Sequence, residues 1–523
     1  MRDFQRPGRS AVYAGNGLCA TSHPLAAKVA IQTLEAGGNA VDAAVAGAVL
    51  LGLCEPQMTG LGGDCFVLLK PAGQEQVVAL NGSGRAPAAQ SSFALRENGH
   101  AAVPLRDVEA ITLPGAVDAF CTLSRDWGHL GLDRVLAPAI HYAETGIPVA
   151  PRVAQDWADE TGVLKGAARR FYLTDGKAPK AGDVFRAPNQ AEVLRRIATQ
   201  GRAGFYEGEV AEDLIASLHA LGGHHTQADL AATRCDYSDP ICGPYRGVDL
   251  LEHAPNGQGA TAILLLNILG HFDIARMDTF GTERAHIEAE ATKLAFDARN
   301  RLLADPTPRL EHMLSQTTAA QLATLINPKR AMPAAAPLTE AVHKDTVYIT
   351  VVDRDRMAVS LIYSIFWGFG SGFASEKYGI LFQNRGAGFT LTEGHPNELA
   401  GGKRPMHTII PAMLRKNGKV IMPFGVMGGA YQPTGHARLV SNLLDFDMDL
   451  QSAIDAPRCF SRPEGMMMER GYAPAVLAEL SAMGHDVKAS PEPLGGAQAI
   501  MMDDRGILIG ASDPRKDGCA LGY

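Results

Sequence analysis

Apolar and polar positions follow a mainly helical period before residue 330 and a strand period after residue 345. A first helix is predicted after Ser22-His23-Pro24, where Ser22 or His23 can act as the N-cap, and Gly37-Gly38 ends it. A second helix, residues 40–53, is so rich in Ala, Val and Leu that we expect it to be buried on most sides. An apolar strand over residues 65–69 follows a glycine-rich turn.

Residues 105–330 are predicted to be mainly helical, and the clearest helix spans residues 282–303. Apolar residues form one stripe of this helix, and charged residues lie opposite. His286 and Glu290 share a face at i,i+4, but the sequence suggests no third metal ligand beside them. We therefore expect a solvated helix face here and no metal site.

The last third of the chain has the residue pattern of β-strands. Strands are predicted at residues 346–353, 357–365, 408–414, 420–424, 497–502 and 506–510, with one helix at 435–444. Asn417-Gly418 is typical of a hairpin turn between the third and fourth of these strands. Early helices and late strands favour stacked sheets enclosed by helices.

Composition and charge narrow the classes of partner. The chain has 523 residues, 46% apolar and 20% charged, with a net charge of −8 and no basic run. This is typical of a compact soluble protein and gives no support to a nucleic-acid partner. No apolar run is long enough for a membrane span and no signal-peptide pattern is visible, so we expect a cytoplasmic location. The eight cysteines are scattered without a CxxC pair and are expected to be reduced thiols.

Thr346 opens the long strand pattern directly after a stretch rich in proline and alanine, residues 327–345. A hydroxyl residue at such a junction is usually only the first residue of a strand. Cleavage of the Asp345–Thr346 bond would, however, free the α-amine of Thr346. An amine with a pKa of about 7.7–8.0 can act as the base for its own hydroxyl, which makes Thr346 a candidate nucleophile.

Short motifs in both halves of the chain resemble those of the γ-glutamyltransferases. The N-terminal half contains Ser22-His23-Pro24-Leu25-Ala26, Gly37-Gly38-Asn39-Ala40-Val41-Asp42-Ala43-Ala44, Glu55-Pro56 and Gly60-Leu61-Gly62-Gly63. The C-terminal half contains Lys403-Arg404-Pro405, Gly428-Gly429 and Gly510-Ala511-Ser512-Asp513-Pro514-Arg515. Each motif alone is weak, but their colinear order along nearly the whole chain makes the resemblance strong.

The resemblance implies an α+β fold, the αββα four-layer sandwich of the N-terminal-nucleophile hydrolases. It also implies a proenzyme that cleaves itself between Asp345 and Thr346. The products would be a large chain, 1–345, and a small chain, 346–523, which together form one composite domain. The expected partners are these two fragments and a small-molecule amide substrate, and a homodimer of such heterodimers is left open. No metal or organic cofactor is implied.

The resemblance assigns roles to four residues. Thr346 would attack the carbonyl carbon both in self-cleavage and in substrate turnover, the latter through an acyl-enzyme. Ser364 matches the family's second hydroxyl, which helps to activate the nucleophile, although a simple strand hydroxyl is the alternative. Gly428 and Gly429 match the oxyanion hole, because two successive N–H groups can point at a developing oxyanion. Their alternative interpretation is a tight turn before a helix.

The substrate-binding positions depart from the family pattern. Ser83 stands where γ-glutamyl enzymes carry an arginine for the substrate α-carboxylate, and Arg85 is the nearest arginine. Gly388 stands where they carry an acid for the α-ammonium group, in a segment that otherwise aligns through Asn384. His407-Thr408 replaces a pair of serines. We expect Arg85, Asn384, His407 and Thr408 to contact the substrate.

Three functions are compatible with these departures. The first is a γ-glutamyl hydrolase or transferase of altered specificity, in which Arg85 replaces the missing arginine. The second is an acylase of the cephalosporin-acylase type, because losing both glutamyl contacts removes roughly 1.5–3 kcal/mol at each end. Phe366 and Trp367 would suit its more apolar acyl pocket, or they simply pack at a strand end. The third is a non-catalytic binding protein, against which the intact Thr346 and Ser364 argue.

Overall fold

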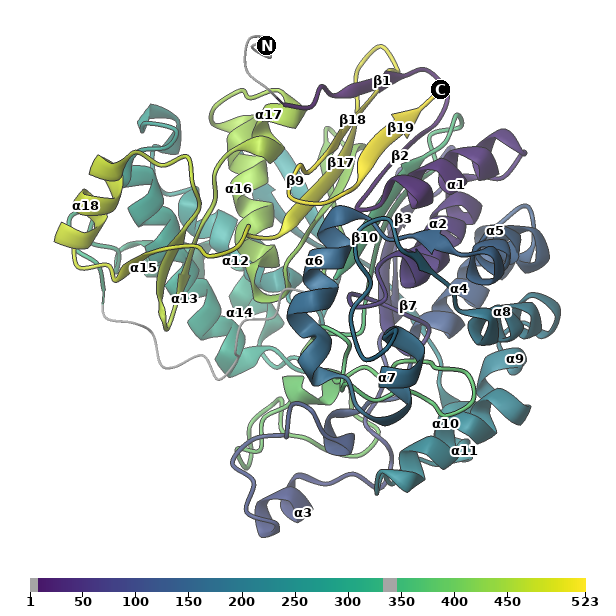
Figure 1. Ribbon diagram of the computed structural model, residues 1–523. Coiled ribbons are helices and arrows are strands. Elements are labelled where there is room, and N and C mark those ends of the chain that lie inside the picture. Colours follow the sequence, from purple (N-terminus) through teal and green to yellow (C-terminus); the bar gives the residue numbers. More distant parts are fainter. Residues whose placement is uncertain (1–7, 333–345) are drawn as a thin grey trace.

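The computed structural model describes residues 8–332 and 346–523, which form four layers (Figure 1). Two seven-stranded sheets stack face to face, and helices cover the outer face of each. All neighbouring strands in these two sheets pair antiparallel. The predicted α+β fold with its αββα arrangement is therefore confirmed.

Each sheet takes strands from both sides of residue 346. Sheet A contains, in spatial order, β1 (Val12–Ala14), β18 (Leu508–Ser512), β17 (Gly496–Met502), β13 (Lys419–Met427), β12 (Ala412–Lys416), β9 (Val248–Glu252) and β8 (Ile241–Tyr245). Sheet B contains β19 (Cys519–Gly522), β2 (Leu18–Thr21), β10 (Val347–Val352), β11 (Ala358–Ser364), β3 (Asp64–Lys70), β4 (Val78–Gly82) and β7 (Asp236–Ser238).

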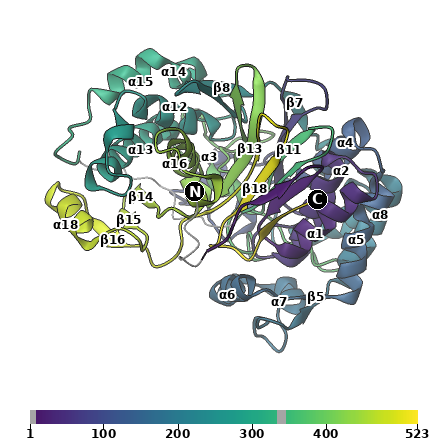
Figure 2. The ribbon, with the colours of Figure 1, turned by 90° about the horizontal axis from the view of Figure 1, so that it is seen from above.

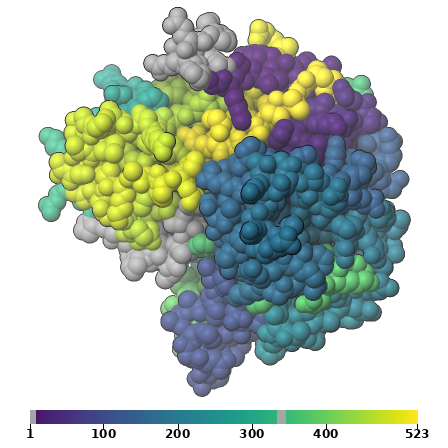
Figure 3. All heavy atoms as spheres, in the orientation of Figure 1, coloured from purple at the N-terminus to yellow at the C-terminus, as the bar shows by residue number. Residues whose placement is uncertain are grey.

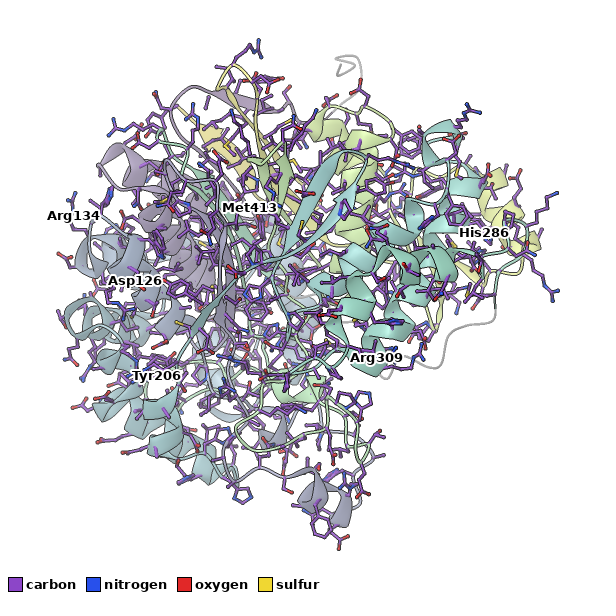
Figure 4. All side chains as sticks on the ribbon, turned by 180° about the vertical axis from the view of Figure 1, so that it is seen from behind. Asp126, Arg134, Tyr206, His286, Arg309 and Met413 are labelled. Atoms are coloured by element: carbon purple, nitrogen blue, oxygen red, sulfur yellow. The ribbon has the colours of Figure 1, made fainter. Side chains whose placement is uncertain are left out.

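Apolar side chains fill the space between the two sheets. One buried cluster joins Phe66 of β3 and Tyr348 of β10 to Met427 of β13. Another joins Val352 of β10 to Met413 of β12, which Figure 4 labels near the centre of the molecule. Because alternate residues of each strand face the opposite sheet, this packing holds β10 and β11 firmly in register.

Two helices pack on the outer face of sheet B, α1 (Pro24–Glu35) and α2 (Ala40–Cys54). His23 is the N-cap of α1, and its Nδ1 accepts a backbone N–H at 3.2 Å, as predicted. Asn39 and Asp42 form a capping box at the start of α2. Helix α2 is buried along its whole length, which confirms the prediction made from its composition.

Two helices, α12 (Gly259–Leu269) and α16 (Gln432–Leu444), cover sheet A on the other side of the molecule, and α13 (Thr282–Leu302) packs against α12 (Figure 2). Their apolar residues form one buried cluster with side chains of β9, β12 and β13. Helix α16 begins shortly after Gly428-Gly429, so the packing of this helix also positions that glycine pair.

The prediction that α13 has a solvated face is wrong. His286, Glu288 and Glu290 are only 0%, 4% and 0% exposed. The C-terminal strand β14 (Cys459–Arg462) packs along the helix, and Arg438 of α16 forms an ion pair with Glu288. The charges are buried because distant segments supply their partners, and local periodicity carries no information about such segments.

Residues 105–330 are mainly helical, as predicted, but they also contain strands β7, β8 and β9, because such short strands carry too few residues for a periodicity signal. One strand boundary needs correction. The strand predicted to begin at residue 408 begins only at Ala412. Residues just before it bond to side chains instead, as the backbone N–H of Ile410 does to Gln432 Oε1 at 2.9 Å.

Smaller elements surround the four layers. The described helices also include α3 (Ser92–Glu97), α4 (Ala116–Trp127), α5 (Leu132–Thr145), α6 (Pro151–Glu160), α7 (Gly166–Tyr172), α8 (Pro188–Gln200), α9 (Ala203–Tyr206), α10 (Gly208–Ala220), α11 (Gln227–Ala232), α14 (Leu310–Leu314), α15 (Gln316–Ala323), α17 (Leu450–Asp455) and α18 (Pro474–Ala482). The small sheets are formed by β5 (Ile147–Pro148) with β6 (Val184–Phe185), and by β14, β15 (Gly465–Met468) and β16 (Val487–Ala489). Figure 3 shows α3 projecting at the lower edge. Within the described ranges, no helix has both the length and the apolar character needed to cross a bilayer.

Candidate functional site

Thr346 immediately precedes β10 and is fully buried. The ladder between β10 and β11 pairs Val347 with Tyr363. Continuing this antiparallel register by one residue places Thr346 opposite Ser364, the last residue of β11. Asp345, the other residue of the predicted cleavage bond, lies outside the described residues. The structure therefore brings the two predicted hydroxyl residues together at one end of sheet B.

Ser364 lies between two neighbours on adjacent strands, because it also pairs with Asp64 at the start of β3. The glycines before Asp64 allow the chain to pack closely against Ser364 and Leu381. A Cβ atom on Gly63 would lie 2.5 Å from the carbonyl oxygen of Ser364, and one on Gly62 would lie 2.0 Å from that of Leu381. Only glycine fits at these two positions, which bring residues 380–384 against the end of β11.

A buried arginine that the sequence analysis did not identify, Arg385, joins the predicted hydroxyls. Its guanidinium donates to Ser364 Oγ at 3.4 Å and to Thr408 Oγ1 at 2.9 Å. The same group lies over the ring of Phe366, 4.0 Å from the centroid, in a cation–π contact. One signal in the sequence could have revealed it, since Arg385 is a lone charge in the glycine-rich residues 379–389.

Phe366 adopts a left-handed backbone conformation with φ of +80°. This conformation costs a non-glycine residue about 1–3 kcal/mol, which the surrounding contacts must offset. The backbone N–H of Phe366 donates to Ser364 Oγ at 2.9 Å, and its ring supports Arg385. Asn384 holds the next residue, because its Oδ1 accepts the backbone N–H of Trp367 at 3.2 Å. The structure thus places Asn384 where it shapes the loop after Ser364.

His407 is buried beside this group and forms a pair with Asp64. Its Nε2 donates to Asp64 Oδ2 at 3.0 Å, and the backbone N–H of Ile409 donates to its Nδ1 at 3.4 Å. These partners assign the neutral tautomer with the proton on Nε2. Burial, and then the positive charge of Arg385, lower the pKa of His407 to about 3. His407 is therefore a neutral donor to Asp64 at any ordinary working pH.

Gly428 and Gly429 form the turn between β13 and α16, with φ of +122° and +55°. Glycine adopts both values without the strain that a side chain would add. Gln258 links this turn to Thr408. Its Nε2 donates to the carbonyl oxygens of Gly429, at 2.9 Å, and Thr408, at 2.7 Å. The predicted oxyanion-hole glycines are therefore connected to Thr408 and, through it, to Arg385.

Arg85 is not part of this network. Its guanidinium donates to the carbonyl oxygen of Gly402 at 3.0 Å and lies 3.7 Å from both Asp236 and Asp305. The side chain is 44% exposed and lines a separate cavity of about 130 Å³ that also touches Ser83. Of the predicted site residues, the structure brings Ser364, Thr408, His407, Asn384 and the glycine pair together with Thr346, but not Arg85.

A polar cavity of about 230 Å³ opens beside the network. Trp367 and Gly495 both line it, and a Cβ atom on Gly428 would lie 2.9 Å from Gly495 Cα. Charged side chains of both signs complete the lining, namely Arg152, Asp156, Asp159, Glu160, Arg462, Glu492 and Lys516. The cavity can therefore accept a polar molecule next to the glycine turn.

Glu55 lies buried close to this cavity and accepts a hydrogen bond from Ser22 Oγ. Burial raises the pKa of Glu55 to about 7, although the positive charge of Lys516 and the Ser22 hydroxyl oppose the shift. Glu55 therefore changes its protonation near neutral pH, unlike an ordinary carboxyl group.

Within the described ranges, metal-ligand spacing occurs at His286, Glu290 and His485. This cluster lies on the α13 side of sheet A and contains none of the residues around Ser364. The eight cysteines are free thiols, five of them buried.

Comparison with known proteins agrees with this geometry. The family model described as gamma-glutamyltranspeptidase matches residues 26–523. A "glutathione hydrolase-like YwrD proenzyme" of Bacillus subtilis is 37% identical, with 96% of this chain and 97% of the relative covered. An "oxamate amidohydrolase proenzyme" of Klebsiella pneumoniae is 35% identical, with 97% and 98% covered. The crystal structure of cephalosporin acylase from Bacillus halodurans superposes with a TM-score of 0.93 at 36% identity, covering 100% of this chain and 99% of that one.

Proposed function

Because the chain belongs to the γ-glutamyltranspeptidase family, we propose that it hydrolyses amides whose acyl group carries a carboxylate close to the scissile carbonyl. The chain is an autoprocessing amidohydrolase, like the proenzymes that it resembles along nearly its whole length. Thr346 is the proposed nucleophile, and the observation that carries the acyl specificity is the position of Arg385 beside Ser364 and Thr408.

Self-cleavage comes first in the proposed mechanism. Thr346 Oγ1 attacks the carbonyl carbon of Asp345, the C–N bond breaks, and the peptide becomes an ester on the threonine. Water then hydrolyses the ester, which leaves a carboxylate on Asp345 and a free α-amine on Thr346. The large chain, 1–345, and the small chain, 346–523, stay together as one composite domain because each sheet contains strands of both.

In turnover, the α-amine of Thr346 accepts the proton of Oγ1 as that oxygen attacks the substrate amide. The N–H groups of Gly428 and Gly429 stabilise the oxyanion. The α-ammonium group returns the proton to the leaving amine, and an acyl ester remains on Thr346. Water, deprotonated by the same amine, then releases the acid.

Ser364 positions the nucleophile in this scheme. Its Oγ accepts the N–H of Phe366 and of Arg385, so its own hydroxyl proton is directed to a third group, and Thr346 is the residue opposite. The hydrogen bond from His407 to Asp64 fixes the start of β3, the strand that pairs with Ser364. The neutral state of His407 prevents a second positive charge there.

Arg385 and Thr408 form the proposed acyl-carboxylate site. A guanidinium fork suits a carboxylate, and its burial strengthens such a contact relative to water. Ser83 and Gly388 stand at the positions where the family resemblance places a glutamyl-binding arginine and acid, so the proposed charge contact comes from Arg385 instead. The similar protein named for oxamate acts on an amide whose carboxylate is attached directly to the carbonyl carbon, which supports this class of substrate.

The second candidate is a larger acyl amide, as in the solved cephalosporin acylase. The observation that favours it is the cavity of about 230 Å³ lined by Trp367 and Gly495, which has room for a bulky polar acyl group. The first and second candidates differ in the acyl group and share the nucleophile.

Variants of the two arginines test the proposed substrate class. Oxamate, succinamate and propionamide differ in whether the acyl group carries a carboxylate and how far it lies from the carbonyl, and γ-glutamyl-p-nitroanilide adds the glutamyl case. We expect oxamate or succinamate to be the best substrate. Arg385→Ala should lower its kcat/KM by about 10- to 150-fold, the equivalent of one charge-assisted hydrogen bond.

The matched control is Arg85→Ala. Arg85 is the arginine that the sequence predicted to bind the substrate, but it lies outside the network around Ser364. It should change kcat/KM by less than about threefold, as expected for a partly exposed ion pair. Propionamide separates a general catalytic defect from lost selectivity, since Arg385→Ala should reduce its turnover far less. Equal losses on charged and neutral amides would contradict the acyl-carboxylate role of Arg385.

A further inference from the structure

Three potential metal ligands meet inside the lobe formed by α13 and the C-terminal segment. His286 and Glu290 lie one turn apart on α13, and His485 lies between α18 and β16. One ligand atom of each falls within 4.8 Å of the others, and all three residues are buried. The third ligand, which the sequence pattern did not suggest, comes from 199 residues further along the chain. Figure 4 shows His286 far from Asp126 and Arg134, on the opposite side of the molecule.

The hydrogen bonds of His286 direct one lone pair toward His485. His286 Nε2 lies 2.7 Å from the carbonyl oxygen of Asn327, which can only accept, so this nitrogen carries the proton. His286 Nδ1 is then an acceptor, 2.7 Å from His485 Nε2. A backbone carbonyl that binds the far nitrogen of an imidazole and so orients the near one is the usual outer partner of a metal-binding histidine.

The carboxylate of Glu290 is oriented in the same way. Its Oε2 accepts the backbone N–H of Met332 at 2.7 Å. Its Oε1 accepts Lys293 Nζ at 2.7 Å, and the lysine also donates to the carbonyl oxygen of Met332 at 3.1 Å. The lysine ammonium therefore occupies the position of a cation beside the carboxylate, and its side chain is 13% exposed.

From this arrangement we infer that His286, His485 and Glu290 form a binding site for a divalent transition metal of the Zn²⁺ type, with Lys293 as the competing cation. Two imidazole nitrogens and one carboxylate suit Zn²⁺ better than Ca²⁺ or Mg²⁺, which require more oxygen ligands. Metal–nitrogen bonds of about 2.0–2.1 Å require the two ring nitrogens to move apart by roughly half an ångström. The ion replaces the hydrogen bond between the two rings and displaces Lys293 from Glu290.

The site also holds the chain that precedes the predicted cleavage bond. Asn327 and Met332, which bond to His286 and Glu290, belong to the last described residues before Thr346. Ala331 is tied to the same lobe, since its backbone N–H donates to the carbonyl oxygen of Met483 at 2.8 Å. Metal binding would therefore act on the two side chains, His286 and Glu290, that anchor residues 327–332.

Titration of metal-free protein with Zn²⁺, against a chromophoric chelator, tests the inference, and Co²⁺ provides a visible spectrum of the site. We expect one site per chain in the wild type. His485→Ala should weaken binding by at least about 10- to 100-fold. Lys293→Met removes the competing ammonium and should tighten binding by about tenfold or more. His271→Ala changes an exposed histidine outside the cluster and should leave the affinity unchanged.

The inference is overturned if wild-type protein binds Zn²⁺ more weakly than about 100 µM, since the ligands would then add little to the affinity of a few surface groups. It is also overturned if His485→Ala binds as tightly as the wild type, because the ion would then lie elsewhere. His485 lies in the short connection between α18 and β16, and Lys293, although within α13, is replaced by a methionine of similar length, so neither variant removes a side chain of the apolar stripe of α13. The readout is metal affinity, which does not depend on the proposed substrate.

Discussion

The two buried polar regions, one around Ser364 and one around α13, are built on different principles. Around Ser364, one arginine, two hydroxyls, a neutral histidine and a strained phenylalanine lie beside a cavity. Around α13, buried charged groups form ion pairs with one another, as Glu288 does with Arg284 and Arg438. The first arrangement suits groups that exchange partners with a substrate. The second suits groups that hold distant segments together.

The largest effect that separates the two regions is expected from Thr346→Ala. Without the hydroxyl there is no attack on the Asp345 carbonyl, so the denatured protein should keep the mass of the intact 55.4 kDa chain. Turnover of every amide should fall by at least about a thousandfold. Mass spectrometry and an amide assay measure the two effects. Thr346→Ser should restore slow cleavage, and two fragments from the alanine variant would exclude Thr346 as the nucleophile.

A smaller effect, on stability and not on chemistry, is expected from Glu288→Gln. The variant leaves the buried Arg284 and Arg438 without their shared carboxylate, which typically costs about 3–5 kcal/mol of the free energy of unfolding. Urea denaturation should show this loss, while kcat/KM of the folded enzyme should stay within about threefold of the wild type. Asp273→Asn, which breaks an exposed pair with Arg276, is the matched control and should leave the urea midpoint nearly unchanged. A large fall in kcat/KM for Glu288→Gln would show that the two regions are coupled.

The smallest effect concerns how the free energy of unfolding depends on pH, to which Glu55 and Glu288 should contribute with opposite signs. The pKa of Glu55 is raised to about 7, so its protonated form is favoured in the folded state. As pH rises from about 4.5 to 7, the unfolded chain loses this proton first, and the free energy of unfolding falls by at most about 3 kcal/mol. Glu55→Gln should remove this fall when urea midpoints at pH 5 and pH 8 are compared.

Glu288 should show the opposite sign. Burial alone would raise its pKa, but Arg284 and Arg438 outweigh that and hold the pKa below the ordinary value of 4.5. Its stabilising contribution is therefore present above the unfolded pKa and is lost as pH falls through the folded pKa. The assignment of a raised pKa to Glu55 would be refuted if the urea midpoint of the wild type, compared with that of Glu55→Gln, were higher at pH 8 than at pH 5.

Sequence patterns were sufficient to predict those helices and strands whose own residues show which side is buried. The apolar residues of α2 predicted a helix buried on most sides, and the strand patterns after residue 345 predicted β10, β11, β13, β17 and β18. The four-layer sandwich followed from the colinear motifs of the family. Short strands such as β7 could not be predicted, because three residues contain little more than one period.

The site was predictable only where its residues match a motif. Ser364, Thr408 and the glycine pair were identified by position, and the structure brings them together. Arg385 was missed because its environment is created by Ser364 and Thr408, which are 21 and 23 residues away along the chain. Arg85 was selected for its closeness in sequence to Ser83, yet its partners Asp236 and Asp305 draw it away from the network.

Strand β10 is the third of seven strands in sheet B, paired with β2 on one side and β11 on the other. A cut before Thr346 therefore creates a chain end in the middle of a folded sheet. The two products are interleaved in both sheets, so neither can leave unless both unfold. Unfolding of the intact precursor yields one molecule, whereas unfolding of the cut protein yields two. The apparent stability of the mature form thus depends on protein concentration, and that of its precursor does not.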